Sequence, residues 1–478
     1  MTVTTTALIG YATYLPRYRL RLSDVKTALG GGPGQGVRVV ASFDEDSTTM
    51  GAEAAAAVLR RTAESPTALY FATTSPAYFD KANATAIHAA LAMPRTAFAA
   101  DMAGSARSGI AAWRAAAATG GLAVLSDVRT GRPGSSDEQL GGDGAVALLF
   151  GDPDRAIAEI IGEQSRSIEI LDRWRTPGAA AGGQWEERFG TESYLPLLQE
   201  VAGQVLAEAG LGQADHVVVV SPNIGVAKQA PRLIAGAIST SVSPLGHAGA
   251  ADFGVGLADA LDRAASGETI LVLSAADGCD AVLLRSTDRL AQVRQARPVR
   301  AQLGDGLDVS YPTYLTWRGW LDREPPRRPE PDRPAGPPSA RAAGWKFSFT
   351  GTVCTACGFV HLPPMRVCRQ CGAVDRMEAR PVATAAGTVA TYTVDRLAFT
   401  PSPPLIEAVV DFDGGGRYTL EIADALPDEL AVGTRVGLAF RKLFTAGGVH
   451  NYFWKARVLS EEHLPMTEEQ HRPAKEMV

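Results

Sequence analysis

Two pairs of cysteines, each spaced C-x-x-C, lie close together near residue 360 and constrain the fold more than any other feature of the sequence. The segment CTACGFVHLPPMRVCRQCG contains Cys354, Cys357, Cys368 and Cys371, with ten residues between the pairs and a glycine after each pair. Four thiolates on two tight turns form a tetrahedral shell that leaves no coordination position open for a substrate. The spacing therefore predicts a zinc ribbon that holds one structural Zn²⁺ per chain.

Two other uses of these cysteines stay open from the residues alone: a pair of disulfides, or a redox-active pair. The chain has five cysteines, and four of them lie within 18 residues, unlike the spread-out framework of a secreted disulfide protein. This clustering favours metal over both alternatives. We do not expect His361, which lies between the pairs, to be a ligand.

Length and charge limit the remaining possibilities. A chain of 478 residues is too long for one ordinary core, so we expect two or three domains. The formal net charge of −6 gives no reason to expect nucleic acid or an anionic membrane as a partner. Residues 1–6 carry neither a basic cluster nor an apolar run, and no stretch is apolar enough to span a bilayer. We therefore expect a cytoplasmic protein whose partner is a small molecule or a protein.

Two similar stretches precede residue 290, each with a β-like run, helices of small residues and a closing pair of strands. The first has expected strands at 68–73, 97–101, 121–128 and 145–150, and helices at 85–92 and 106–118. The second has expected strands at 216–220, 269–273 and 280–285, and helices at 226–237 and 250–264. This order predicts an internal duplication that gives two facing βα halves.

The rest of the chain reads as a linker and a small barrel. Proline-rich residues 323–344 cannot continue a helix or a sheet ladder. Five strand-like runs predict a Greek-key barrel of OB type; they are 388–393, 405–411, 418–422, 435–440 and 452–458. The expected boundaries are 1–165 and 166–322 for the two halves, 323–344 for the linker, 345–380 for the ribbon, 381–465 for the barrel and 466–478 for a tail.

An aromatic connector ends the second half. Tyr311, Tyr314, Trp317 and Trp320 recur at three-residue spacing, which predicts an aromatic helical face. We expect this face to pack against a neighbouring domain rather than to hold a cofactor.

Several segments resemble bacterial and archaeal hydroxymethylglutaryl-CoA synthases, which are relatives of ketoacyl synthase III in the thiolase superfamily. LIGYATYLPRYRL resembles the opening strand, TSPAYFDKANAT the loop before the second helix, ADMAGSARSGIAAW the nucleophile turn, GGDGAVALLFG the first-half hairpin, and PLGHAGAADFGVGLADALDRA a late helix start. The resemblance covers roughly residues 7–285. It implies an α/β fold of the thiolase-like αβαβα layered type, a CoA thioester as substrate, and a homodimer.

Past the linker, the ribbon with PSPPLIEAVVDFDGGGR and HNYFWKAR is similar to zinc-ribbon and OB-fold modules that accompany thiolase relatives as partner subunits. This implies a C-terminal rubredoxin-like zinc ribbon and a β-barrel OB-fold. It also offers a thiolase as an alternative protein partner.

The resemblance locates the family's catalytic positions, and this chain differs at each of them. The family's nucleophilic cysteine falls on Ala106, or on Ser105 if the alignment slips by one residue. The general-base glutamate falls on Thr74, the catalytic histidine on Val220 or Ser221, and the asparagine on His247. Alanine cannot carry an acyl group, so we do not expect an acyl-cysteine mechanism. Ala106 and Thr74 are expected to line the pocket.

His247 is our first catalytic candidate, because the resemblance places it where a side chain faces the pocket. A neutral imidazole could donate to a thioester or ketone oxygen, or exchange a proton in aldol or retro-aldol chemistry. A helix-capping role is the alternative. Ser105 could act as a nucleophile if a base lay beside it, Tyr78 could donate its phenol to an oxyanion, and the Gly278 amide could complete an oxyanion hole.

Three functions compete. The first is an acyl-CoA enzyme that makes or breaks a carbon–carbon bond without an acyl-cysteine. The second is a non-catalytic protein that binds acyl-CoA or scaffolds a thiolase. Ordinary synthase or thiolase activity ranks third, because it would need cysteine chemistry. The sequence does not define the acyl substrate.

Overall fold

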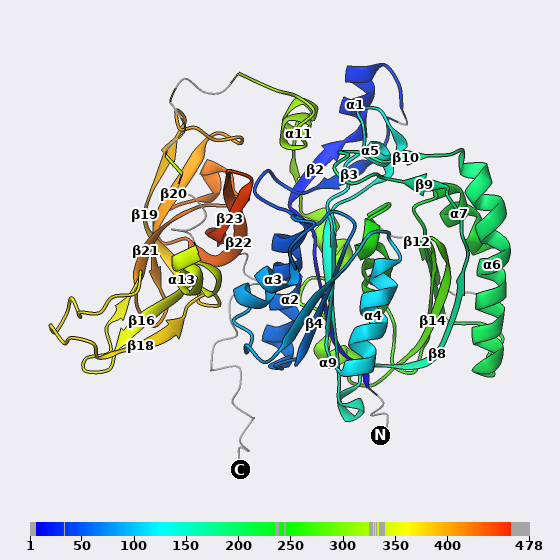
Figure 1. The fold of residues 1–478 in the computed structure, drawn as a ribbon, viewed down its shortest axis with the longest axis horizontal. Helices are drawn as coiled ribbons and strands as arrows, with labels where there is room; N and C mark the ends of the chain where they lie inside the picture. Colours follow the sequence, from blue (N-terminus) through cyan, green and yellow to red (C-terminus); the bar gives the residue numbers. More distant parts are fainter. Residues whose placement is uncertain are drawn as a thin grey trace, which may run out of the picture. The chain divides into compact units, whose positions relative to one another are not determined.

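The computed structural model describes residues 6–32, 34–234, 239–242, 245–324 and 340–459, together with 328, 330, 332 and 333. The chain divides into two compact units, Met1–Glu324 (unit 1) and Pro325–Val478 (unit 2). In Figure 1 the colours run from blue to green through unit 1 and from yellow to red through unit 2. No helix within the described residues is both long enough and apolar enough to cross a membrane.

Unit 1 is built on a sheet whose two halves repeat one topology. Within the described residues the strand order is β12-β11-β13-β14-β8-β1-β7-β6-β4-β5. In each half three strands are parallel (β5-β4-β6 and β12-β11-β13) and the next two are antiparallel (β7-β1 and β14-β8). β1 and β8 join the halves where Leu8 pairs with Ala158. The matching topology is the internal duplication that the sequence predicts.

The strands of the first half are β1 (Ala7–Tyr14), β4 (Ala68–Thr73), β5 (Phe98–Ala103), β6 (Leu122–Asp127) and β7 (Gly144–Gly151). Those of the second half are β8 (Ala158–Ser167), β11 (His216–Val220), β12 (Ser239–Val242), β13 (Thr269–Ala275) and β14 (Gly278–Ser286).

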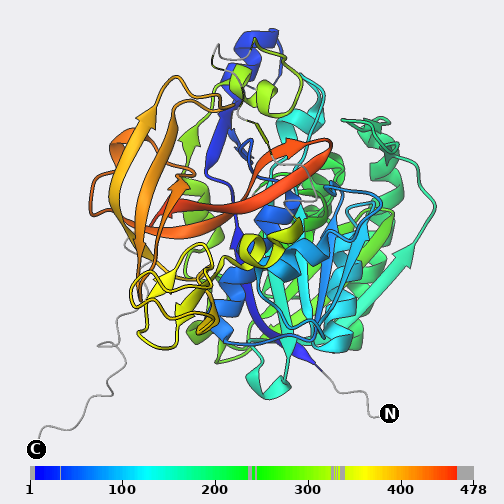
Figure 2. The same ribbon diagram turned by 60° about the vertical axis from the view of Figure 1, so that its left-hand side comes forward.

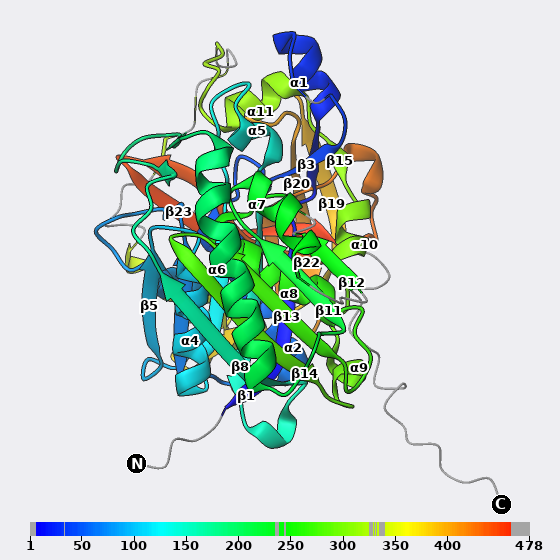
Figure 3. The same cartoon turned by 90° about the vertical axis from the view of Figure 1, so that its right-hand side faces the viewer.

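Helices cover both faces of each half. They are α2 (Ser47–Thr62), α4 (Ser108–Thr119), α6 (Glu187–Glu208) and α8 (Asp252–Leu261). Side chains alternate along a strand, so neighbouring residues report opposite faces. In the first half, Val124 lies against α2 and its neighbour Leu125 lies against α4. In the second half, Val218 shares a core with α4 and α8, and its neighbour Val217 shares a core with α6. Figure 3 shows α6 along β8 and β14. The layers are therefore αβαβα, with α4 and α8 innermost.

One expected helix is shorter than predicted. The helix predicted at 226–237 is α7 (Ile224–Gln229), followed by a 3₁₀ turn over Ala230–Arg232. Pro231 has no amide hydrogen and its ring clashes with the preceding turn, which ends the α-helix there. Residues 235–237 lie outside the described residues.

The aromatic connector packs inside unit 1. Tyr311 and Tyr314 of α11 (Tyr311–Trp317) are buried in a small core with Leu20, Val25 and Val40. The neighbour of this aromatic face is thus a satellite core of the same unit. Trp320 lies beyond the helix, after Gly319, whose φ of 73° lets the chain leave the helix.

The remaining elements of unit 1 surround this frame. They are β2 (Tyr18–Arg21), α1 (Leu22–Leu29), β3 (Val37–Val40), α3 (Ala84–Ala90), α5 (Ser136–Leu140), β9 (Arg173–Trp174), β10 (Gly183–Gln184), α9 (Leu290–Val293), α10 (Val299–Gly304) and β15 (Leu307–Asp308).

Unit 2 contains a small ribbon and a barrel, which confirms the predicted fold classes. The ribbon strands are β16 (Thr350–Cys354), β17 (Val360–His361) and β18 (Met377–Pro381), and the helix α13 (Ala343–Ser348) precedes them. The barrel strands are β19 (Gly387–Asp395), β20 (Leu405–Phe412), β21 (Arg417–Glu421), β22 (Arg435–Ala446) and β23 (Val449–Val458), in the order β21-β20-β19-β22-β23. A bridge between Ile422 and Ala456 closes the sheet, and Figure 2 shows these strands in orange and red.

Candidate functional site

The four ribbon cysteines converge on one point in unit 2. Their Sγ atoms all lie within 4.8 Å of one another. The Cys354 and Cys371 sulfurs are 3.7 Å apart, and those of Cys357 and Cys368 are 3.6 Å apart. Four sulfurs around zinc at the usual bond length of about 2.3 Å lie about 3.8 Å from one another. The sulfur geometry therefore fits a tetrahedral zinc ion and is too open for disulfide bonds.

Local turns produce this arrangement. The amide of Gly358 donates to the carbonyl of Cys354 at 2.8 Å, and the amide of Gly372 donates to that of Cys368 at 3.0 Å. Both glycines have a left-handed φ, 77° and 73°, which a side chain would disfavour. Each C-x-x-C-G segment is thus a tight turn that presents two sulfurs on one side. His361 is buried on β17 and does not belong to the group of clustered ligand atoms.

A second site is a cavity of about 170 Å³ in unit 1. The turn before α4 borders it on one side and the β9–β10 hairpin on another. Its lining residues include Thr74, Ser75, Ser105, Ala106, Arg129, Asp137, Asp172, Arg173, Arg175, Tyr194, His247 and Asp277. None of the described lining residues is a cysteine.

The structure brings four of the predicted site residues to this cavity. Ser105, Ala106, Thr74 and His247 all line it. Tyr78 is not among its lining residues; its backbone exchanges hydrogen bonds with the side chain of Asn83, in the loop after β4. Gly278 is also outside the lining, at the start of β14, although its neighbour Asp277 is part of it.

Close backbone packing fixes the turn that carries Ser105 and Ala106. A Cβ at Gly109 would lie 2.4 Å from the carbonyl oxygen of Ala250, so only glycine lets α4 approach this segment. The turn is also held from the second half of the sheet. Arg107 forms an ion pair with Asp280, with Nε and Oδ2 2.8 Å apart, and donates to the carbonyl of Asp277 at 2.9 Å.

Cys279, which is the one cysteine of unit 1 in the sequence, packs in the core with α6 and is not among the lining residues of the cavity. Its side chain is fully buried, and its Sγ lies 3.6 Å from the carbonyl oxygen of Tyr194. Burial, and next the charge of Asp280, raises the pKa of this thiol to about 12. The thiol is therefore protonated at neutral pH and inert as a nucleophile.

His247 is buried where two segments meet. Its amide donates to the carbonyl of Leu140 at 2.8 Å, and its carbonyl accepts from the amide of Gly142. Its Nδ1 lies 3.5 Å from Asp252 Oδ2, without hydrogen-bond geometry. Burial, and next the charges of Arg129 and Arg173, lower the pKa of His247 well below its usual value. The imidazole is therefore neutral at physiological pH.

A second cavity of about 100 Å³ adjoins the first at His247. Apolar residues from the end of β11 and from α7 line much of it, including Val219, Val220, Pro222 and Ile224. Val220 and Ser221, the two positions between which the resemblance leaves the family's catalytic histidine, both line it, and Ser221 Oγ donates to the carbonyl of Ala275. The two cavities share five lining residues: Asp137, Asp172, Arg173, Pro222 and His247.

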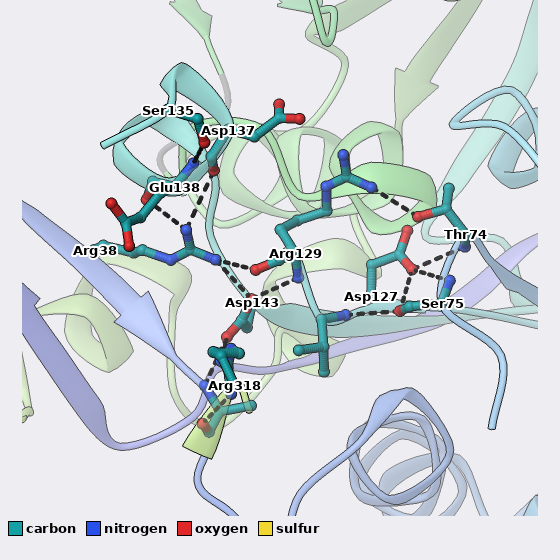
Figure 4. A network of polar contacts seen from close by, with 12 residues as sticks. Arg38, Thr74, Ser75, Asp127, Arg129, Ser135, Asp137, Glu138, Asp143 and Arg318 are labelled. Atoms are coloured by element: carbon teal, nitrogen blue, oxygen red, sulfur yellow. Dashed lines mark hydrogen bonds and ion pairs between the residues drawn. The ribbon is translucent and has the colours of Figure 1, made fainter. Parts of the chain in front are cut away.

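Buried carboxylates hold segments that line the polar cavity, and Figure 4 shows the contacts of two of them, Asp127 and Asp143. Asp127 accepts hydrogen bonds from the amides of Thr74 and Ser75 at 2.8 and 3.0 Å, and from the amide of Ala250 at 2.6 Å. It therefore ties the turn after β4 to the turn before α8. This explains how Thr74 and His247 come to line one cavity although they are far apart in sequence.

Asp143 organises the neighbouring segment. Its carboxylate is fully buried, and it pairs with Arg38 and Arg318, two guanidiniums that are almost completely buried. It also accepts from the amide of Arg129 at 2.8 Å. Asp143 is thereby the anchor that positions the backbone of Arg129 at the cavity wall.

Three arginines in the cavity were missed by sequence reasoning. Arg129 donates to Thr74 Oγ1 at 2.8 Å, and Arg175 donates to the carbonyl of the same threonine. Arg173 pairs with Asp137, with Nη1 and Oδ1 2.5 Å apart. For Arg173 and Arg175 the sequence offered one signal: the segment DRWR, in which two arginines flank an aromatic residue in a stretch without a clear periodicity. It could have suggested a charged hairpin, but not where the hairpin lies.

A buried acid, Asp172, was missed as well; it directly precedes Arg173 and lines both cavities. Asp172 accepts from the hydroxyl of Tyr194 at 3.2 Å, and the same hydroxyl accepts from the amide of Asp277 at 3.1 Å. Burial raises the pKa of Asp172, which makes it a better proton acceptor near neutral pH than an exposed aspartate.

Comparison with known families identifies the modules of unit 2. A family model described as the ChsH2 rubredoxin-like zinc ribbon domain matches residues 347–375. Another, described as the ChsH2 C-terminal OB-fold domain, matches residues 379–441. The ribbon and the barrel that the sequence predicts are therefore both present.

Unit 1 is similar to hydroxymethylglutaryl-CoA synthases. The enzyme of Methanopyrus kandleri is 29% identical over 335 residues, which cover 64% of this chain and 95% of that protein. The enzyme of Methanosarcina barkeri is 26% identical over 348 residues, which cover 67% and 99%.

Solved structures show the same fold. A hydroxymethylglutaryl-CoA synthase complexed with CoA matches with a TM-score of 0.57 at 17% identity, over 65% of this chain and 90% of the other. The 3-oxoacyl-(acyl carrier protein) synthase III of Pseudomonas aeruginosa matches with a TM-score of 0.51 at 19% identity, over 59% and 99%. The chain therefore joins a thiolase-like domain, similar to hydroxymethylglutaryl-CoA synthases, to a zinc ribbon and an OB-fold.

Proposed function

We propose that unit 1 acts on a CoA thioester and makes or breaks a carbon–carbon bond, by aldol or Claisen chemistry or their reverse, without an acyl-cysteine intermediate. The similarity to synthases, one of them solved with CoA, supports the substrate class. The observation that carries the proposal is the polar cavity, which His247, Asp172 and Ser105 line together with the turn before α4, and no cysteine is among the described lining residues.

The cleaving direction of an aldol reaction defines the groups required. A base removes the proton of a hydroxyl group β to the thioester carbonyl. The bond between the α and β carbons then breaks, and its electron pair moves onto the thioester oxygen to give an enolate. The released half leaves as a ketone or aldehyde, and the enolate takes up a proton at its α carbon. Such a reaction needs one base and one hydrogen-bond donor at the thioester oxygen, and no nucleophile.

His247 suits the donor role. Its neutral imidazole can donate one hydrogen bond to the oxygen on which negative charge develops, and burial makes such a bond stronger than it would be in water. Its backbone bonds to Leu140 and Gly142 fix the main chain that carries the ring.

Asp172 suits the base role in the same cavity. Its burial raises its pKa, so the proton that it accepts is held more firmly than by an exposed carboxylate. The hydrogen bond from Tyr194 orients it. Ser105 remains a weaker candidate, since its Oγ accepts from the amide of Arg107 at 3.2 Å and no base has been found beside it among the described residues. For Tyr78 and the Gly278 amide we keep an oxyanion role as a proposal of lower rank.

A non-catalytic role is the alternative function. The contacts of His247 with Leu140, Gly142 and Asp252 would also suit a residue whose task is to join two segments. A protein of this kind would bind acyl-CoA, or scaffold a thiolase, and would leave every thioester unchanged.

We further propose that the zinc of unit 2 is structural and that the protein works as a homodimer in the cytoplasm, with a thiolase as the alternative partner. A closed shell of four thiolates supports the first point, since it leaves no position for a substrate. Sedimentation of the purified protein, alone and with a thiolase, tests the second.

The first test is mass spectrometry of a panel of acyl-CoA, β-hydroxyacyl-CoA and β-ketoacyl-CoA thioesters, incubated with zinc-loaded protein with and without small aldehyde or acyl acceptors. We expect a changed carbon skeleton for at least one thioester. His247→Ala should lower that turnover by about a hundredfold or more, in the range of general acid–base groups. His88→Ala, a histidine of the same unit outside the cavity lining, is the matched control. Thioesters that bind but stay unchanged would favour the non-catalytic alternative.

A further inference from the structure

The cavity of about 100 Å³ beside the polar cavity has a wall that the proposed chemistry does not use. Val220, Pro222, Ile224 and Ala227 form this wall, and they come from the end of β11, the turn after it and α7. Val220 and Ala227 are buried, and the other two are half-buried. We call this space the apolar cavity. It is a built hydrophobic site next to the groups that we assign to the reaction.

The buried polar side chains of the same wall already have partners within the protein. Ser221 Oγ donates to the carbonyl of Ala275 at 2.8 Å and accepts from the amide of Asn223 at 3.1 Å. The side chain of Asn223 donates to the carbonyl of Glu187 at 2.9 Å and accepts from the amide of Val226 at 3.2 Å. A polar group placed against this wall loses its hydrogen bonds to water without an equal return. The wall therefore favours an apolar group.

We propose that the apolar cavity holds an alkyl substituent on the β carbon of the thioester, so that aldol cleavage releases an apolar aldehyde or ketone. This inference rests on the proposed function, and it names the half of the substrate that does not carry CoA.

The residues that the two cavities share orient this substrate. His247, the proposed donor to the thioester oxygen, and Asp172, the proposed base at the β hydroxyl, line both cavities. The bond that breaks therefore lies where the cavities meet. Ser105 and Ala106 line the polar cavity alone, and we place the thioester at their turn. The substituent of the β carbon then extends to the other side of His247, into the apolar cavity.

The cleavage is balanced without any co-substrate. With a butyl group on the β carbon, the substrate is 3-hydroxyheptanoyl-CoA. Its β hydroxyl loses a proton to the base, the bond between the α and β carbons breaks, and the electron pair moves onto the thioester oxygen. Pentanal leaves, and the enolate takes up one proton at its α carbon to give acetyl-CoA. The two products together contain all the atoms of the substrate.

The volume of the apolar cavity limits the length of the substituent. An apolar cavity of about 150 Å³ accommodates benzene, so one of about 100 Å³ has room for about four carbon atoms. Trp185 also lines the cavity and is 58% exposed, so the cavity opens to solvent beside an indole ring. Carbons beyond the fourth therefore lie at this opening and gain less from burial.

Steady-state cleavage of a homologous series tests the proposal. The substrates are 3-hydroxyacyl-CoA thioesters with a methyl, ethyl, propyl, butyl or hexyl group on the β carbon, and mass spectrometry measures the acetyl-CoA and the aldehyde that zinc-loaded protein forms. We expect kcat/KM to rise about fourfold for each carbon up to about four, as burial of a methylene implies, and to change little from butyl to hexyl. A 3-hydroxypropyl group, which replaces the last methyl of butyl by a hydroxyl, should lower kcat/KM at least about tenfold.

Two opposite changes at Ile224 test the site itself. Ile224→Ala enlarges the cavity, so hexyl should then exceed butyl by about tenfold. Ile224→Phe fills it, so the ratio of butyl to methyl should fall by about tenfold. Ile161→Ala, on a half-buried isoleucine of β8 that lines neither cavity, is the matched control and should retain the wild-type profile. Thermal unfolding shows which variants are folded, and either Ile224 variant alone decides the question.

Equal kcat/KM across the series, or a wild-type profile in a folded Ile224 variant, would overturn the inference and leave the proposed function standing. Conversion of other thioesters but of no member of the series would do the same. If neither the series nor any thioester of the broader panel were converted, the proposed function would fail, and the inference with it.

Discussion

The zinc ribbon of unit 2 and the polar cavity of unit 1 each gather polar side chains into a small volume, but they are built in opposite ways. The ribbon takes its four sulfurs from 18 consecutive residues on two turns. The cavity takes its side chains from segments between Thr74 and Asp277, held by a buried sheet and by carboxylates such as Asp127 and Asp143. A bound metal ion organises the ribbon, and the folded chain itself organises the cavity. Changes at the two sites should therefore act through different causes.

The largest effect is expected at the ribbon. Cys354→Ser removes one thiolate of the shell, and structural zinc contributes on the order of 10 kcal/mol to the folding of a domain of this kind. We expect zinc content to fall from one ion per chain to near zero, and residues 350–381 to lose their protection from hydrogen exchange. Metal analysis and hydrogen exchange measure the two effects.

Cys279→Ala is the control for that experiment, because Cys279 is buried in unit 1 and lies outside the sulfur cluster. It should keep one zinc per chain. Zinc retained by Cys354→Ser at full stoichiometry, with the ribbon still protected, would show that the ribbon does not depend on the tetrahedral shell.

A smaller but still large effect is expected at the frame of the cavity. Asp143→Asn leaves Arg38 and Arg318 buried without their counter-charge, and breaking such a buried pair costs about 3–5 kcal/mol. Chemical denaturation of the full chain, followed through a probe in unit 1, measures this loss. Zinc content should stay at one ion per chain.

The matched control is Asp308→Asn, which removes the same kind of charge from an exposed pair with Arg21. Water screens that pair, so the unfolding midpoint should not change. Equal losses for the two variants would mean that burial of the Asp143 network does not stabilise the cavity.

The smallest effect is the pH dependence of stability that His247 contributes. Its folded-state pKa is depressed by burial, so below the ordinary pKa of about 6.5 the unfolded chain binds a proton that the folded chain excludes. The contribution of neutral His247 is therefore complete above pH 6.5 and is lost as the pH falls, at no more than about 1.4 kcal/mol per pH unit.

Denaturation of the wild type and of His247→Gln between pH 7.5 and 5 measures this contribution. As the pH falls, the free energy of unfolding of the wild type should decrease relative to that of His247→Gln. A difference independent of pH would mean that His247 is not shielded from protons, and its role as a neutral donor would lose its basis.

The sequence predicts what is local. The C-x-x-C spacing alone defines the ribbon, because all four ligands and both glycine turns lie within one short segment. The order of strands and helices predicts the duplicated halves of unit 1, because hydrophobic periodicity reports elements directly. One helix was predicted too long: we expected it to continue to residue 237, but the α-helix ends just before Pro231.

The cavity could be predicted only in part, because its walls come from distant segments. Resemblance brought Thr74, Ser105, Ala106 and His247 to attention, and the structure places all four on one cavity. Arg129 carries no sequence signal of its own, and DRWR around Arg173 suggests a charged hairpin at most, since nothing local says that a hairpin and a strand end will meet. The placement of Arg129 depends on the register of the sheet and on Asp143, which only the folded chain reveals.

The central claim, that unit 1 converts a CoA thioester without an acyl-cysteine, is tested most directly with Cys279→Ala, since this variant leaves unit 1 without any cysteine. Turnover of the responsive thioester is followed by mass spectrometry, together with the intact mass of the protein quenched during turnover. The account predicts turnover at the wild-type rate and no acyl adduct on either protein. An acyl adduct on the wild type that disappears with Cys279, or the absence of conversion in both proteins, would contradict it.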